Sequence, residues 1–280
     1  MINALPLGLP LKTRSMTSLL VALPLVLSGC AFWGESKKAP EPVAEVQKFS
    51  EQSERATLPK AWQAWRITPQ KNKTKYSLKR YEGKTVLHAQ ADVAASGLVL
   101  AIKPRLTEEL ELRWQWKALS YIPQAEPRES QRDDAPLRIM VAFDGDKSKL
   151  PFKEQMVFEM AKVISGHDMP YATLMYVWAS QSPVETIYTS SRTSRIKMIV
   201  VNSGPNDLGV WQTHRRNLKD DYQNAFGEAP GKVIGLGLMT DSDNTRTQVS
   251  AIYGDIELAD KKKNKAASQA STKTNSTTNK

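Results

Sequence analysis

Two carboxylates and an amide are concentrated in one short segment of the chain, residues 239–245. Asp241, Asp243 and Asn244 lie here, between an apolar run and a second run with a strand-like pattern. Side chains of these types in a short connection between strands can stabilise a tight turn, bind a hard cation such as calcium, or hydrogen-bond a polar ligand. The segment is therefore the first candidate for a ligand site, with all three interpretations open.

The segment does not follow the spacing of an EF-hand calcium loop. Counted from Asp241, that loop requires glycine at its sixth position and glutamate at its twelfth. The chain has Arg246 and Ile252 at these positions. A calcium site of another kind, with Asp241 and Asp243 as ligands beside backbone carbonyls, stays an alternative, and no other cofactor is expected.

Further charged residues flank a predicted strand at residues 137–143. Asp134 precedes this strand, Arg138 lies near its start and Asp144 follows it. Glycoside hydrolases need two carboxylic groups about 5–10 Å apart across the sugar. The sequence gives no distances, and loop aspartates commonly form turns. A hydrolase that uses two loop carboxylates, such as Asp134 and Asp241, is therefore one alternative to a binding module.

The seven tryptophans offer candidate stacking surfaces for a sugar. Trp114 and Trp116 fall on the apolar positions of an alternating strand, which predicts that they pack in the core. Trp178 ends an apolar run and is followed by a polar loop, so it is the better candidate for an exposed platform. None of the three histidines has a second histidine at metal-ligand spacing, and the sequence has no G-x-S-x-G motif.

Period-two patterns predict that the folded part is mainly β. Residues 110–117 alternate apolar and polar side chains without exception, and residues 137–143 make a second such face. Helical spacing predicts only two short helices, at residues 152–164 and 218–226. A change of phase near Ala251 indicates a β-bulge or a strand buried on both faces. These patterns predict an antiparallel β-sandwich of the jelly-roll-like kind.

The first 29 residues have the features of an export signal. Basic residues are followed by an apolar run at residues 17–27 that is too short to span a bilayer. The run ends in Leu-Ser-Gly-Cys, which resembles the lipobox of bacterial lipoproteins and implies that Cys30 is lipidated. Ala31 follows the cysteine, and this implies sorting to the outer membrane, facing the periplasm. A plain secretory signal is the alternative.

Composition divides the remaining chain into three parts. Residues 30–58 are predicted to be a lipidated N-terminus and flexible tether, residues 59–259 a single β-sandwich domain, and residues 260–280 a disordered tail rich in Lys, Ser and Thr. The formal charge of +10 comes mostly from the ends, since the first 29 residues carry two basic groups and the last twenty carry six. The other 31 basic and 29 acidic residues nearly cancel, which argues against nucleic-acid binding.

Several motifs follow one another along the folded part: Leu112-Arg113-Trp114-Gln115-Trp116, Asp133-Asp134 with Arg138, Tyr176-Val177-Trp178, Leu208-Gly209-Val210-Trp211 and Tyr253-Gly254-Asp255-Ile256. With residues 239–245, where the match is densest, they resemble a bacterial family named domain of unknown function 3047. The resemblance extends over about residues 60–258. It implies a sandwich fold and no established activity.

The sequence favours a non-catalytic lipoprotein of the cell envelope that binds a carbohydrate or another polar polymer. In this hypothesis the ligand contacts residues 239–245, with Arg138 and Trp178 nearby, and Cys30 provides the membrane anchor. Two alternatives stay open: a polysaccharide hydrolase that uses loop carboxylates, and a structural or assembly partner in the envelope. A fold prediction alone does not separate these three functions.

Overall fold

The computed structural model describes residues 41–260, which include the whole predicted domain. The predicted signal peptide, Cys30 with the first part of the tether, and the tail from residue 261 onward lie outside the described residues. No helix within residues 41–260 is both long and apolar enough to cross a membrane.

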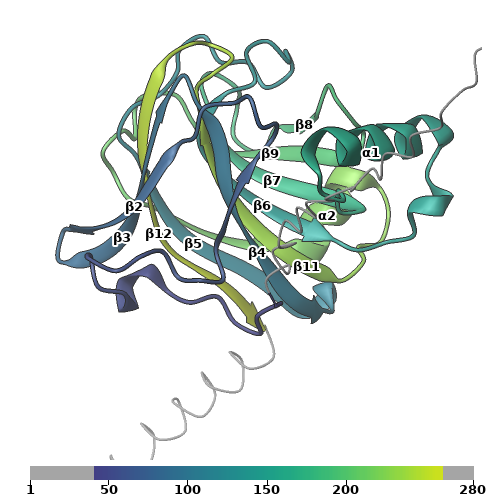
Figure 1. Ribbon diagram of the computed structural model, residues 1–280, viewed down its shortest axis with the longest axis horizontal. Helices are drawn as coiled ribbons and strands as arrows, with labels where there is room; N and C mark the ends of the chain where they lie inside the picture. Colours follow the sequence, from purple (N-terminus) through teal and green to yellow (C-terminus); the bar gives the residue numbers. More distant parts are fainter. Residues whose placement is uncertain (1–40, 261–280) are drawn as a thin grey trace, which may run out of the picture. The chain divides into compact units, whose positions relative to one another are not determined.

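Two β-sheets form the framework of the domain (Figure 1). The first sheet has seven strands in the order β1 (Gln63–Arg66), β4 (Ala95–Arg105), β11 (Val233–Asp241), β6 (Ala135–Phe143), β7 (Ala172–Ala179), β9 (Ile196–Ser203) and β8 (Ile187–Thr189). The second has five, in the order β10 (Gln212–Asn217), β5 (Leu110–Ala118), β12 (Gln248–Asp260), β3 (Lys84–Asp92) and β2 (Lys75–Tyr81).

Neighbouring strands within residues 41–260 pair in the antiparallel sense, except β7 and β9, which are parallel. The parallel pair arises because the chain forms β8 at the sheet edge before it returns as β9 between β7 and β8. The prediction of a mainly β, antiparallel sandwich is confirmed, with this one parallel pair as an addition.

The core lies between the two sheets because each sheet buries one face. The alternation of β5 is realised, since Leu112, Trp114 and Trp116 are buried in one cluster with Leu174 and Tyr176 of β7. The indole planes of Trp114 and Trp116 meet edge to face, with ring centroids 5.4 Å apart. The predicted core position of both tryptophans is confirmed.

His214 is half-buried and packs against the tryptophans of this core. Its ring lies 4.8 Å from that of Trp114, and its Nε2 is 2.8 Å from Oδ1 of Asn202, which also accepts the indole N–H of Trp116. Burial, helped by the charge of Arg216, lowers the pKa of His214 to about 4. The imidazole is therefore neutral at physiological pH and acts as packing.

Two helices complete the domain, as the sequence predicts. α1 (Phe152–Ser165) and α2 (Leu218–Phe226) each end at a glycine, Gly166 with φ 74° and Gly227 with φ 72°. These left-handed backbone conformations end a helix at low cost only when the residue lacks a Cβ. Three short 3-10 helices lie in connections: η1 (Phe49–Glu51), η2 (Thr107–Glu109) and η3 (Lys147–Lys149).

The predicted irregularity of the last strand is a β-bulge in β12. Tyr253 is opposite Trp116, but the next pair on β5 is Ile256 with Trp114, so β12 carries one extra residue at this point. The bulge lies a few residues beyond Ala251, where the apolar pattern changes phase.

Candidate functional site

A buried ion pair joins β6 to β11. Arg138 of β6 is opposite Met239, and Asp241 follows Met239 on the same face of β11. The Nε of Arg138 donates to Oδ1 of Asp241 at 3.0 Å, and its Nη2 donates to Oδ2 at 3.3 Å. Both residues are almost inaccessible to solvent, at 4% and 3% exposure. The pair therefore needs further partners to offset its desolvation.

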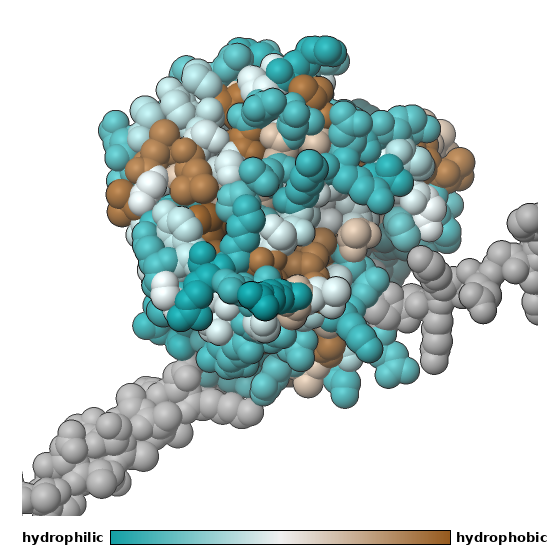
Figure 2. All heavy atoms as spheres, turned by 60° about the vertical axis from the view of Figure 1, so that its left-hand side comes forward, coloured by the Kyte–Doolittle hydropathy of each residue, from teal (hydrophilic) through white to brown (hydrophobic). Residues whose placement is uncertain are grey.

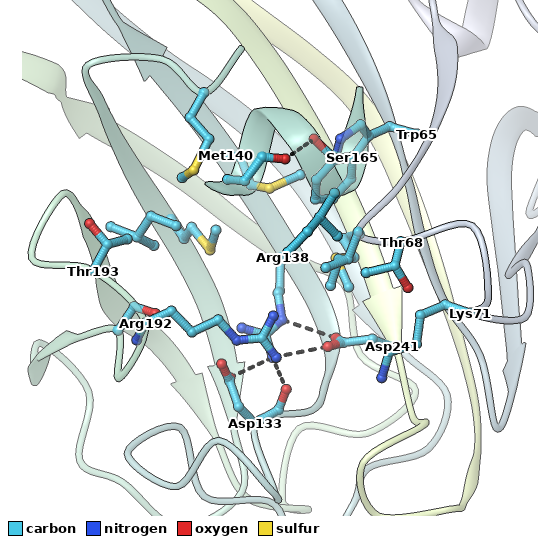
Figure 3. A pocket seen from close by; sticks show the side chains of 18 of the residues that line it. Trp65, Thr68, Lys71, Asp133, Arg138, Met140, Ser165, Arg192, Thr193 and Asp241 are labelled. Carbon is cyan, nitrogen blue, oxygen red and sulfur yellow. Dashed lines mark hydrogen bonds and ion pairs between the residues drawn. The ribbon is translucent and has the colours of Figure 1, made fainter. Parts of the chain in front are cut away.

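Asp133 provides further hydrogen-bond acceptors for the guanidinium of Arg138. Nη2 of Arg138 donates to the Oδ1 and to the backbone carbonyl of Asp133, each at 2.9 Å. Nη1 donates to the sulfur of Met198 at 3.5 Å. One guanidinium is thus shared by two carboxylates, as the dashed lines in Figure 3 show.

Burial sets the protonation behaviour of this cluster. Burial, with a smaller contribution from the nearby Asp134 and Asp133, raises the pKa of Asp241 to about 7 against the opposing charge of Arg138. Burial alone would lower the pKa of Arg138, but the charges of Asp241 and Asp133 raise it above its ordinary value. The guanidinium stays charged, and Asp241 is the group that titrates near neutral pH.

Asp134 holds the loop between β11 and β12. Its carboxylate accepts the backbone N–H of Thr245 at 2.7 Å, the hydroxyl of Thr245 at 2.6 Å and the backbone N–H of Asn244 at 3.3 Å. The side-chain amide of Asn244 donates to the carbonyl of Asp133 at 3.2 Å. The segment 239–245 is therefore a turn fixed by side chains, and Asp134, at 2% exposure, faces the loop and not the solvent.

A cavity of about 530 Å³ opens beside this ion cluster (Figure 3). One end is ionic and is lined by Lys71, Asp133, Arg138, Arg192, Asp241 and Asp243. Lys71 forms an ion pair with Asp243 across the loop. The rest of the lining is mainly apolar, and it includes six of the nine methionines in the sequence. We call this cavity the methionine pocket.

The floor of the methionine pocket is the outer face of the seven-stranded sheet. Met140, Met175, Met198 and Met239 come from four adjacent strands, β6, β7, β9 and β11. Their neighbours in each strand face the core, so these four side chains point to the opposite face. Thioether side chains are flexible and polarizable, and they adapt to ligands of different shape.

The wall of the pocket is α1. Val157, Met160, Ala161 and Ile164 recur at helical spacing and line the pocket from one face of the helix. Phe158 is the one buried residue of α1, and Met160 and Ile164 are more than half exposed. The helix therefore stands over an accessible cavity and is not packed tightly against the sheet.

Arg192 brings a cation without a partner to the ionic end. Its side chain lines the pocket and, in Figure 3, extends toward the Arg138 cluster. Within residues 41–260, the guanidinium of Arg192 makes no hydrogen bond or ion pair. Lys71 and Arg138 are both paired with carboxylates, so Arg192 is the cation available to an incoming anion.

The sequence-predicted residues divide into those that reach the pocket and those that do not. Arg138, Asp241, Asp243 and Asn244 line it together, and Asp134 lies directly behind them. Asp144 lies at the opposite end of β6, where it accepts the backbone N–H of Lys232. Ten residues of extended chain separate Asp144 from Asp134, or roughly 30 Å. The structure therefore does not bring Asp144, a candidate ligand-binding residue, together with the other carboxylates.

Trp178, the better candidate for an exposed platform, is buried instead. Trp178 has 0% exposure, and its indole N–H donates to the carbonyl of Gly204 at 3.0 Å. The reason is visible in β7, where Ala172, Leu174 and Tyr176 face the core and Trp178 continues the same alternation.

The calcium interpretation has no geometric support among the described residues. In residues 41–260, no group of three or more His, Cys, Asp or Glu side chains is arranged to hold a metal ion. Arg138 neutralises Asp241, and Lys71 neutralises Asp243. Calcium takes about six to eight oxygen ligands, and these two carboxylates already face cations.

Sequence reasoning missed the apolar part of the site. The signal was present, since Met140, Met175 and Met198 are apolar side chains on the face of the strand that does not face the core. Strands that are apolar on both faces are typical of sheets covered on both sides. Arg192 and Lys71 lie in loops with no pattern that would relate them to Asp241.

A family model described as "Protein of unknown function (DUF3047)" matches residues 60–257. The chain belongs to this family. The matched range begins before β1 and ends within β12, and it includes the loops of the methionine pocket. A search of curated proteins finds no match to the chain.

Solved structures with a similar arrangement include carbohydrate-binding modules and a glycoside hydrolase. The family 11 carbohydrate-binding module from Clostridium thermocellum in complex with a mixed-linked tetrasaccharide is 8% identical, with 78% of this chain and 95% of that chain covered and a TM-score of 0.37. A mannan-recognising module, TmCBM27, is 13% identical, with 77% and 95% covered and a TM-score of 0.28. Endoglucanase 3 from Trichoderma harzianum is 8% identical, with 73% and 100% covered and a TM-score of 0.34. At such low identities and TM-scores, the likeness says nothing about ligand or activity.

Proposed function

We propose that the protein is a non-catalytic binding module of the cell envelope, and that its ligand is an anionic amphiphile held in the methionine pocket. The apolar chain of the ligand lies between α1 and the methionine floor, and its head group meets Arg192 at the ionic end. In this proposal Cys30 is lipidated and anchors the module in the outer membrane, with the domain in the periplasm.

The proposal rests on the separation of apolar and charged side chains in the methionine pocket. Thioether and aliphatic side chains line most of a cavity of about 530 Å³, while charged groups are confined to one end. An apolar cavity with a few convergent polar groups is typical of a small-molecule site. A molecule with one long apolar part and one charged group matches this division.

A polar polymer, which the sequence favours, fits the same pocket less well. A polysaccharide carries hydroxyls along its whole length, and each buried hydroxyl needs a hydrogen-bond partner. The floor of Met140, Met175, Met198 and Met239 offers only weak thioether acceptors. The pocket therefore favours an amphiphile over a glycan at this place.

The candidate carboxylates already take part in ion pairs and hydrogen bonds within the protein, which favours a binding function over hydrolysis. Asp241 is paired with Arg138, and Asp134 accepts three hydrogen bonds from the loop that it holds. Asp144 is roughly 30 Å along β6, beyond the spacing of about 5–10 Å that glycoside hydrolysis requires. None of these groups is placed as a free acid and base pair across a substrate.

A titration of the full-length protein with lysophosphatidylglycerol tests the proposal. The Met160→Glu variant places a charge in the pocket, and Met156→Glu places the same charge elsewhere on α1. The two residues are similarly exposed, at 58% and 49%, so neither substitution disturbs a packed core. Isothermal titration should show binding by the wild type and by Met156→Glu, and at least about tenfold weaker binding by Met160→Glu. Equal affinities for the two variants, or no binding by the wild type, would contradict the proposal.

A further inference from the structure

A second cavity, of about 280 Å³, lies on the outer face of the five-stranded sheet. β5 directs Trp114 and Trp116 into the core, so Gln115 between them faces outward into this cavity. Figure 2 brings the side of β2, β3 and β12 forward, and its surface is mostly hydrophilic with separate hydrophobic patches. Because its walls include Trp211 and Tyr81, we call it the aromatic cavity.

The glycine at the β12 bulge lets the indole of Trp211 lie close to the sheet. A Cβ at Gly254 would be 3.4 Å from Cζ3 of Trp211 and 3.2 Å from Cβ of Gln115. Tyr81 meets Trp211 edge to face, with ring centroids 6.3 Å apart and planes at 76°. The two rings therefore form a fixed aromatic corner over the strand backbone.

Glu82 and Lys117 hold this corner in place. Glu82 accepts the indole N–H of Trp211 at 2.7 Å and the amine of Lys117 at 2.8 Å. Glu82 adopts φ 47° in the turn before Gly83, a backbone conformation that is unfavourable for most residues other than glycine. The amine of Lys117 lies 4.7 Å from the ring centroid of Tyr81 and 5.1 Å from that of Trp211.

The charges around the aromatic cavity favour a ligand that carries no charge. Lys117, at 3% exposure, already occupies the cation–π position at both rings. The carboxylates of Glu82 and Asp255 line the cavity together with the amine of Lys84, so both signs of charge are present in its lining. A neutral ligand fits this lining, with an apolar face for the rings and hydroxyls for the polar groups.

We propose that the aromatic cavity binds a neutral hexopyranose unit of an oligosaccharide. The apolar face of the sugar ring packs on Trp211, and its hydroxyls hydrogen-bond Glu82, Asp255 and Gln115. Ser50 donates its backbone N–H and its hydroxyl to Asp255 at 2.9 and 2.6 Å, which fixes that carboxylate. A carboxylate has about four acceptor sites, so Asp255 and Glu82 each retain capacity for a sugar hydroxyl.

This proposal does not depend on the amphiphile proposal. The aromatic cavity belongs to the five-stranded sheet and the methionine pocket to the seven-stranded sheet, and the two share no lining residue. Each cavity also contains one partly exposed tryptophan, Trp211 in the first and Trp65 in the second. Substitution of the tryptophan of one cavity is therefore a matched control for ligand binding at the other cavity.

Saturation-transfer NMR and isothermal titration of the full-length protein test the inference, with cellotetraose, maltotetraose and chitotetraose as probes. We expect at least one probe to bind the wild type, and Trp211→Ala to weaken that binding at least about tenfold. Trp65→Ala should leave the affinity for the tetrasaccharide unchanged. Binding of lysophosphatidylglycerol by Trp211→Ala should equal that of the wild type, so failure of one proposal is distinguishable from failure of the other.

Three results would overturn the inference: no binding of any of the three probes, unchanged binding by Trp211→Ala, or loss of binding in Trp65→Ala alone. Circular dichroism shows whether each variant is folded. If Trp211→Ala does not fold, Gln115→Ala decides the question, because Gln115 lines the cavity from the exposed face of β5 and is not the partner of a buried charge. This variant should bind the tetrasaccharide at least about fivefold more weakly, and an unchanged affinity would likewise overturn the inference.

Discussion

A buried cation lies at each of the two cavities, Arg138 at the methionine pocket and Lys117 against the rings of the aromatic cavity, and the two cations have different partners. In the methionine pocket, Arg138 is shared by Asp241 and Asp133, and all its partners belong to the protein. In the aromatic cavity, Lys117 lies beneath two rings and pairs with the exposed Glu82. Arg138 is therefore mainly structural, whereas Glu82 remains accessible to a ligand. The linings of the two cavities also differ. Flexible thioether side chains line the methionine pocket, and rigid aromatic rings line the aromatic cavity.

The largest expected effect is on stability, and it comes from the Arg138 cluster. Arg138→Met leaves the buried carboxylate of Asp241 without its cation, which costs about 3–5 kcal/mol in the free energy of unfolding. The double variant Arg138→Met/Asp241→Leu removes both charges and should recover most of that loss. Urea denaturation measures both values. If the free energy of unfolding of Arg138→Met fell by less than about 1 kcal/mol, the pair of Arg138 and Asp241 would behave like an ion pair exposed to solvent.

A smaller effect is expected from Gly254, and only at the aromatic cavity. In Gly254→Ala the added Cβ lies 3.2 Å from both Cβ and the carbonyl oxygen of Gln115, so β5 and β12 must move apart slightly where they form the base of the cavity. We expect a loss of about 1–2 kcal/mol in tetrasaccharide binding, measured by titration, with lysophosphatidylglycerol binding unchanged. Equal losses at both sites would show that the two cavities are not independent.

Arg192 should contribute about 1 kcal/mol to amphiphile binding, or roughly fivefold in affinity. Arg192→Gln removes the cation at the pocket mouth but keeps a hydrogen-bonding side chain. Arg80→Gln, an exposed arginine on β2 outside the pocket, is the matched control. Titration with lysophosphatidylglycerol compares the two variants, and an equal effect of both would argue against a head group at Arg192.

The smallest expected effect is a pH dependence of amphiphile binding. Burial raises the pKa of Asp241 to about 7, so this carboxylate takes up a proton as the pH falls from about 8 to about 6. The ionic end then carries less negative charge, and the affinity for lysophosphatidylglycerol, whose phosphodiester stays ionised, should rise about two- to threefold. Asp241→Asn should remove this dependence. If the affinity of the wild type for lysophosphatidylglycerol fell as the pH was lowered from about 8 to about 6, the predicted direction of the effect would be wrong.

The same protonation should affect stability in a defined direction. The pKa of Asp241 is higher in the fold than its unfolded value of about 3.9, so the folded protein binds the proton more tightly. Stability from this group therefore rises as the pH falls through about 7 and is complete below the unfolded value.

Much of the fold follows from local patterns in the sequence. The period-two alternation of residues 110–117 predicts both β5 and the core position of Trp114 and Trp116. Helical spacing with Gly166 predicts the extent of α1. Local patterns, however, do not predict which sheet a helix covers. The position of α1 over the four methionines of the pocket floor therefore cannot be predicted without the strand order. The parallel pairing of β7 with β9 depends on the same long-range arrangement.

The candidate site was predictable only in its ionic half. Asp241 and Arg138 were identifiable as charged residues beside strands, and the pairing of β6 with β11 brings them together. The polar loop after Trp178 favours an exposed side chain, whereas its position continues the inward alternation of β7 and the side chain is buried. Arg192 could not be assigned, since its loop has no periodic pattern and its role depends on what lies across the pocket.

The most direct test of the central claim is NMR of the full-length protein with ¹³C-labelled methionine methyl groups, titrated with lysophosphatidylglycerol. If the amphiphile occupies the methionine pocket, the signals of Met140, Met160, Met169, Met175, Met198 and Met239 shift, because these residues line it. The signal of Met156, which lies on α1 outside the pocket, stays in place. Unchanged signals from the six lining methionines at saturating amphiphile would contradict the account.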